Sequence, residues 1–163
     1  MDDLFAPPGA AWAAVSPALA RMRRAVLAAF TAVVLGALVI ADLVLDLPVW
    51  TSVLVAVAVL GLAAAGWLVI GRSVRRWGYA ERDEDLYITR GALNRRLVVV
   101  PYGRMQYVDV QAGPLDRAYG IARIQLHTAS PGTSAQLPGL PAAEAARLRD
   151  RLTSLGEAQA AGL

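Results

Sequence analysis

Cysteine and lysine are absent from this sequence of 163 residues, and histidine occurs once, at His127. Without cysteine the chain forms neither a disulfide nor a thiolate metal site, and one histidine cannot build a histidine cluster. Charged residues make up only 18% of the chain, whereas hydrophobic residues make up 56%. This balance is unusual for a soluble protein and points to a membrane segment.

A large positive excess is lacking as well. Residues 1–76 carry six arginines and four aspartates (+2), and residues 77–163 carry ten arginines and nine acidic residues (+1), which together give the net charge of +3. Nucleic-acid-binding domains concentrate a much larger excess on one face. We therefore predict no nucleic-acid partner.

Motifs that carry chemistry are also missing. The sequence has no glycine-rich phosphate loop, no nucleophile elbow and no metal-ligand spacing. The acidic run Glu81–Asp85 lacks the alternating ligands of a calcium loop, so we expect a solvated turn there. The sequence predicts no catalytic residue, no cofactor and no metal site. A membrane enzyme stays open only as a third hypothesis, because the fold can assemble titratable residues from distant positions.

Two long apolar runs are present, Ala25–Leu45 and Val49–Ile70. Each is long enough to cross a bilayer core about 30 Å thick as a helix. A cleavable signal peptide is disfavoured for the first run because its charged region lies far from the start and a second span follows at once. We predict an antiparallel transmembrane hairpin.

Arginines flank the hairpin on one side only. Arg21, Arg23 and Arg24 precede the first span, Arg72, Arg75 and Arg76 follow the second, and residues 42–48 contain no basic residue. The positive-inside rule then places both termini in the cytoplasm.

Small and acidic residues within the spans suggest two further roles. Ala28, Ala32 and Gly36, like Gly61 and Ala65, recur every four residues, a spacing that we interpret as close packing within the hairpin, with a homodimer seam as the alternative. Asp42 and Asp46 lie at the outer end, where water reaches them, so a proton relay is the weaker interpretation.

The sequence after Arg76 changes to short alternating runs typical of strands. We predict strands at residues 86–90, 97–100, 105–110, 121–128 and 135–137 and one helical turn at Leu115–Tyr119. Pro141 is expected to begin a last helix, and Gly156 to end it. The predicted domains are a cytosolic N-terminal segment (1–24), the transmembrane hairpin (25–70), a cytosolic domain (77–156) and a flexible tail (157–163). We expect the first eighteen residues to be loosely ordered.

Several stretches of this domain resemble one known family, the bacterial pleckstrin-homology (PH) membrane proteins of the YdbS-like type. The stretches are Tyr87–Gly91, Asn94–Arg96, Val99–Asp109, Gln111–Arg117, Tyr119–Gly120 and Ala122–Thr128. The resemblance covers about residues 20–155 and implies a PH-like β-barrel of seven strands with a C-terminal capping helix, directly after two transmembrane helices. It also implies a multi-pass protein of the bacterial inner membrane.

The candidate contact residues for a lipid or a partner are seven arginines: Arg72, Arg75 and Arg76 after the hairpin, and Arg90, Arg95, Arg96 and Arg104 around the first β-hairpin and the next turn. Simpler roles are a topology signal for the first group and a solvated strand face for the second. For protein contacts the candidate surface is Pro101–Asp109 with the turn Gly113–Gly120. In that turn we expect Asp116 and Arg117 to balance each other's charge.

From these features we expect a non-enzymatic membrane protein whose cytosolic domain docks a membrane-protein partner or a second copy of itself. The alternative is a module that senses anionic phospholipid at the cytosolic leaflet.

Overall fold

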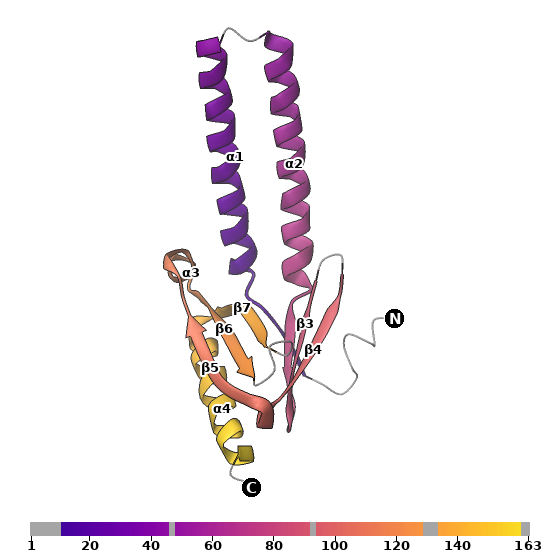
Figure 1. Ribbon diagram of the computed structural model, residues 1–163, viewed down its shortest axis with the longest axis vertical. Helices are drawn as coiled ribbons and strands as arrows, with labels where there is room; N and C mark the ends of the chain where they lie inside the picture. The colour runs from indigo at the N-terminus through magenta and orange to yellow at the C-terminus, as the bar shows by residue number, and fades with distance from the viewer. Residues whose placement is uncertain (1–10, 46–47, 92–93, 129–133, 161–163) are drawn as a thin grey trace. The chain divides into compact units, whose positions relative to one another are not determined.

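The structure is a computed structural model that describes residues 11–45, 48–91, 94–128 and 134–160 (Figure 1). In chain order the elements are β1 (Trp12–Ala14), α1 (Ala18–Leu45), α2 (Val49–Arg75), β2 (Gly78–Glu81), β3 (Asp85–Arg90), β4 (Arg96–Pro101), the short 3-10 helix η1 (Tyr102–Arg104), β5 (Met105–Gln111), α3 (Pro114–Ala118), β6 (Ile121–Thr128), β7 (Ala135–Pro141) and α4 (Ala142–Ala160). The chain forms two compact units. We call Ala20–Arg72 the hairpin unit, and the residues up to Leu19 together with those from Ser73 onward the β unit.

The hairpin unit consists almost entirely of α1 and α2. With 28 and 27 residues these helices are about 40 Å long, which exceeds the apolar thickness of a bilayer. Both are long and apolar enough to cross a membrane. Near the turn, the hydroxyl of Ser52 on α2 donates a hydrogen bond to the carboxylate of Asp42 on α1. Asp46 lies outside the described residues.

The predicted close packing of small residues within the hairpin is wrong at Gly36 and Gly61. A methyl group added at Gly36 or Gly61 would meet nothing within 4 Å, so these glycines lie on open faces of their helices. Close approach occurs instead at Gly66, against Leu27, and at Gly71, against the guanidinium of Arg24. At these two positions the side chains of Leu27 and Arg24 occupy the space beside the glycine, so a small residue is needed there.

The β unit begins before the hairpin, so residues 11–18 are ordered, contrary to expectation, while residues 1–10 lie outside the described residues. Strand β1 pairs antiparallel with β2, with Ala13 opposite Tyr79. The Ser16 N–H then donates to the Gly139 carbonyl at 2.8 Å, and Leu19, 2% exposed, packs against the same glycine. A segment on one side of the hairpin sequence therefore completes a sheet formed on the other side, and the spans do not simply precede the domain.

Two antiparallel sheets form the rest of the β unit. Sheet A has the order β1-β2-β3-β4 and sheet B the order β5-β6-β7. Alternation places one face of each strand inward, and the fully buried side chains form one core that draws on both sheets and α4: Leu86, Ile88, Val100, Tyr102, Ile124, Leu126, Leu137, Leu140, Leu148 and Leu152. The seven strands of the described chain thus enclose a single hydrophobic interior.

The last helix differs from its predicted bounds at both ends. Pro141 still belongs to β7, opposite Ile121, and α4 begins at Ala142. Gly156 does not end the helix, which continues to Ala160. Glycine lowers helix stability but does not stop a helix whose other residues are good formers, as the alanines here are. Part of the expected flexible tail, 157–163, is therefore helical, and residues 161–163 lie outside the described residues.

Candidate functional site

Five of the seven candidate arginines gather at one end of sheet A, where β2 begins, β3 ends and β4 begins. Arg90 ends β3 and lies directly opposite Arg96, the first residue of β4. The Arg90 guanidinium lies 6.0 Å from the ring centre of Trp77, the residue before β2. We call this group the basic end, and its members are Arg75, Arg76, Arg90, Arg95 and Arg96. Since α2 ends at Arg75, the chain enters the basic end directly from the hairpin.

Solvent reaches both arginines of this pair, because Arg90 is half-buried and Arg96 is exposed at the end of the sheet. They follow Leu86 and Ile88 of β3, and Val100 of β4, on the inward-facing side of the sheet. Like charges directly opposite each other destabilise a strand pair. An anion bound at this end would offset that repulsion, which makes the basic end a candidate anion site.

The other two candidate arginines are not members of this group. Arg104 ends η1, which follows Pro101, and Pro101 pairs with Asp85 at the opposite end of sheet A. The six residues of β3 separate the two ends by about 17 Å. Arg72 belongs to the hairpin unit. The sequence suggested one cluster of four arginines, but the structure places Arg104 apart from Arg90, Arg95 and Arg96.

A second candidate site is a groove between β5 and α4, which run alongside each other (Figure 1). Its volume is about 360 Å³, and it is lined by Met105, Gln106, Tyr107, Val108, Leu152, Thr153, Gly156 and Glu157. We call it the β5–α4 groove. Strand β5 is an edge of sheet B, and its register shifts between Met105 and Tyr107, which leaves Gln106 as a bulge. Bulges often occur beside functional sites because they redirect side chains.

An ion-pair network holds α4 on β2 and so fixes the helix that forms one wall of the groove. Arg147 pairs with Glu81 of β2 and, at 2.6 Å, with Glu144, while Arg151 reaches Glu81 at 2.9 Å. The Tyr79 hydroxyl donates to Glu144 at 2.6 Å. Burial, followed by the Glu144 carboxylate, raises the pKa of Tyr79 to about 12. The hydrogen bond from Arg147 lowers the pKa of Glu144 below its ordinary value.

The turn after β5 is held by a charge pair different from the expected one. Asp116, with its side chain 7% exposed, pairs at 2.9 Å with Arg123 of β6 rather than with its neighbour Arg117. The same carboxylate oxygen accepts the Gly113 N–H at 3.1 Å and closes the start of α3. Adjacent residues on a helix point in different directions, so a cross-element partner is better placed than the sequence neighbour.

His127 lies in β6 as predicted and stacks on Tyr107 of β5, with ring centres 4.2 Å apart. Glu81–Asp85 forms the turn from β2 to β3, with the Arg82 N–H bonded to the Asp85 carbonyl. Among the residues that the structure describes, no group of three His, Cys, Asp or Glu side chains is placed to hold a metal ion.

Comparison with known families agrees with this architecture. The family model described as "Bacterial PH domain" matches residues 17–155. The chain belongs to the bacterial PH domain family. The implied fold is confirmed: two long apolar helices, two antiparallel sheets and a C-terminal helix. Strand β1 lies outside the matched range, so the first strand of this PH domain precedes both the match and the hairpin.

The chain is 29% identical over 136 residues to the transmembrane protein YdbS of Bacillus subtilis (strain 168), and the match covers 83% of this chain and 84% of that protein. No solved structure matches the present chain. Together with the two candidate spans, these comparisons make the chain a YdbS-like transmembrane protein with a PH domain.

Two parts of the candidate sites were not predicted from the sequence. The α4 wall of the β5–α4 groove was one, because 45 residues separate Val108 from Thr153 and no local pattern joins them. Trp77 at the basic end was the other. An aromatic residue directly after two arginines is a usable signal, since guanidinium groups pack on indole rings.

Proposed function

We propose that this transmembrane protein is not an enzyme and that it uses its PH domain, on the cytoplasmic side of the bacterial inner membrane, to dock another protein or a second copy of itself. The observation that carries the proposal is the β5–α4 groove beside the edge strand β5. Edge strands accept added strands, and adjacent grooves select the side chains of the added segment. The stacking of His127, the sole histidine, on Tyr107 agrees with a non-enzymatic role.

The groove suggests the chemistry of the partner segment. Met105, Val108 and Leu152 provide apolar lining, while Gln106 and Glu157 add polar groups. The bulge interrupts the edge at Gln106, so a partner strand has Tyr107–Gln111 available for pairing. An extended segment with one large apolar side chain fits this arrangement.

Two neighbouring residues of α4 allow a matched test of docking. Both residues are exposed, but only Thr153 lines the groove, and both hydroxyls donate to backbone carbonyls of the preceding turn. The full-length protein is purified from its own membranes in mild detergent, and co-purifying proteins are identified by mass spectrometry. We expect a stoichiometric partner that Thr153→Arg removes and Ser154→Arg retains. A partner that survives both changes would place docking elsewhere.

The orientation is part of the proposal and has its own test. Because the chain has no cysteine, single cysteines can be introduced at Pro48, in the hairpin turn, and at Ser134, in the PH domain. A membrane-impermeant thiol reagent should label Pro48→Cys once the outer surface of the inner membrane is accessible, and Ser134→Cys only after that membrane is permeabilised. Labelling in the reverse order would invert the proposed topology.

A second candidate function, sensing of anionic phospholipid, is favoured by the basic end. The opposed pair Arg90 and Arg96, with Trp77, offers charge and an aromatic ring where the chain leaves the hairpin. Each arginine near an anionic surface contributes about 1 kcal/mol. Because β1 completes the sheet, the full chain must be used. Hydrogen exchange in nanodiscs should slow around residues 90–96 with phosphatidylglycerol relative to phosphatidylcholine, and salt should reduce the difference. Equal exchange in both lipids would remove this candidate.

A further inference from the structure

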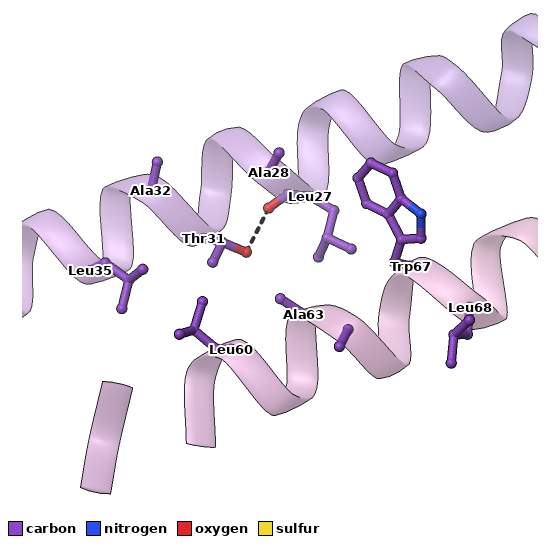
Figure 2. Close-up of a pocket in the computed structure, with 10 residues that line it drawn as sticks. Leu27, Ala28, Thr31, Ala32, Leu35, Leu60, Ala63, Trp67 and Leu68 are labelled. Carbon is purple, nitrogen blue, oxygen red and sulfur yellow. Dashed lines mark hydrogen bonds between the residues drawn. The ribbon is translucent and has the colours of Figure 1, made fainter. Parts of the chain in front are cut away.

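The hairpin unit contains a groove of its own between α1 and α2, with a volume of about 680 Å³ (Figure 2). It is lined by Leu27, Ala28, Thr31, Ala32, Leu35, Leu60, Ala63, Ala64, Trp67 and Leu68. The α1 residues extend over about 12 Å of helix. The only hydroxyl in the lining, on Thr31, donates to the Leu27 carbonyl at 2.8 Å, so the groove offers an apolar interior.

A charged side chain lies at one end of this groove. The guanidinium carbon of Arg24 lies 4.8 Å from the ring centre of Trp67, which lines the groove. Arg24 Nε is buried and has no hydrogen-bond partner in the described part of the chain, and no acidic side chain there forms an ion pair with this arginine. A buried part of a guanidinium group without a partner favours a bound anion.

The position of this end in the membrane indicates what supplies the counter-ion. Arg24 directly precedes the apolar run that starts at Ala25, and Trp67 lies near the end of the second run. Tryptophan and arginine at the ends of spans lie at the level of the lipid headgroups. Phosphate groups are the anions at that level, and arginine binds phosphate strongly.

A transmembrane helix of a second copy is the competing occupant. With side chains a helix is about 10–12 Å wide, whereas packed helices are only 8–10 Å apart, so a third helix would rest above the groove rather than enter it. The exposed glycines Gly36 and Gly61 are not among the lining residues, so the open small residues do not form one seam with the groove. An acyl chain is narrow enough to enter.

We propose that the hairpin unit binds one anionic phospholipid, with an acyl chain in the α1–α2 groove and its phosphate on Arg24. The site is independent of the PH domain and of the docking proposed for it. It gives the hairpin a specific ligand in addition to its role as an anchor.

Photolabelling of the full-length protein tests the site directly. The protein is reconstituted in vesicles of equal parts phosphatidylglycerol and phosphatidylcholine, with a trace of either lipid carrying a diazirine in one acyl chain, and labelled residues are located by mass spectrometry. We expect labels on the groove residues of α1 and α2, with about fivefold more from the phosphatidylglycerol probe. Labels spread evenly around both helices would show ordinary boundary lipid and overturn the proposal.

Matched variants separate the headgroup from the acyl chain. Arg24→Gln should reduce labelling by the phosphatidylglycerol probe about fivefold, to the level of the phosphatidylcholine probe, whereas Arg21→Gln should change neither. Ala28→Leu, which fills the groove, should reduce labelling by both probes, and Ala29→Leu, outside the lining, should not. Retained phosphatidylcholine labelling in Arg24→Gln would show that the hairpin is still formed.

Two results would contradict the site. One is an Arg24→Gln protein that keeps its preference for phosphatidylglycerol. The other is efficient disulfide dimerisation of an Ala28→Cys variant in the same vesicles, which would place a second copy over the groove. Because the chain has no other cysteine, such a dimer could form only through the introduced residue. Changing Arg90 and Arg96 to alanine should leave groove labelling unaltered, which distinguishes this site from the basic end.

Discussion

The hairpin and the PH domain differ in the exposure of their leucine side chains. Leu62 of α2 is 75% exposed, and Leu137 of β7 is fully buried. Both positions are favourable because the surroundings differ: exposing a leucine to lipid costs little, whereas removing a leucine from water stabilises the folded domain. The exposed apolar surface of α1 and α2 is therefore what a membrane span requires, and the PH domain is the part that folds by burying its own core.

This comparison predicts the largest effect of a single truncation. Leu137→Ala should lower the free energy of unfolding of the PH domain by about 2–5 kcal/mol, because it leaves a cavity in a packed core. Leu62→Ala should leave PH-domain unfolding almost unchanged. Urea unfolding of the full-length protein in detergent measures both, with hydrogen exchange of β6 as the probe. Equal effects would mean that the two regions share one cooperative core.

The boundary between the two regions can be tested at Gly139, which has φ +73° and on which a methyl group would overlap Leu19. We expect Gly139→Ala to cost about 2–3 kcal/mol, since the left-handed conformation alone costs about 1–2 and Leu19 must also move. Gly120→Ala is the control, because its φ is +66° but nothing lies within 4 Å, and it should cost about 1 kcal/mol. Equal losses of stability would argue that the start of α1, at Leu19, does not pack on the PH domain.

The sequence predicts those parts of the architecture that depend on residues close together in the chain. The five predicted strands correspond to β3–β7 because alternation is local, and the spans follow from uninterrupted apolar length. Strand β1 has three residues, and β2 has four that begin with glycine, too few to show a period. Their pairing joins Ala13 to Tyr79 across the whole hairpin, which no window of sequence reveals.

Side-chain partners were predicted less well than strands, for a related reason. The sequence placed Arg104 with Arg90 because only 14 positions separate them, but one strand length keeps them apart. It left Arg24 as one of three topology signals, although its guanidinium packs on Trp67, 43 positions away. Periodicity indicates which face a residue occupies, whereas contacts depend on which elements become neighbours.

Alkaline pH should lower the free energy of unfolding of the PH domain by less than the Leu137 and Gly139 substitutions do. The raised pKa of Tyr79 means that the folded protein keeps a proton that the unfolded chain loses above pH 10, so stability falls as pH rises toward 12. At about pH 11 the loss from this group is about 1 kcal/mol. Burial raises the pKa of Tyr102 in the same direction, so part of the slope should remain in Tyr79→Phe. Urea midpoints across this range measure the slope. An unchanged slope in Tyr79→Phe would contradict the assignment.

The smallest effect is expected within the hairpin, at the hydrogen bond between Ser52 and Asp42. Ser52 is only 9% exposed, yet hydrogen bonds between membrane helices contribute about 0.6 kcal/mol on average, because the alternative states also find partners. Ser52→Ala should therefore weaken helix association by about that amount, measured by steric trapping in micelles, and Thr51→Ala, whose hydroxyl bonds the Pro48 carbonyl instead, is the control. A loss of several kcal/mol would show that the hairpin depends on one specific polar contact as strongly as the PH domain depends on a core leucine.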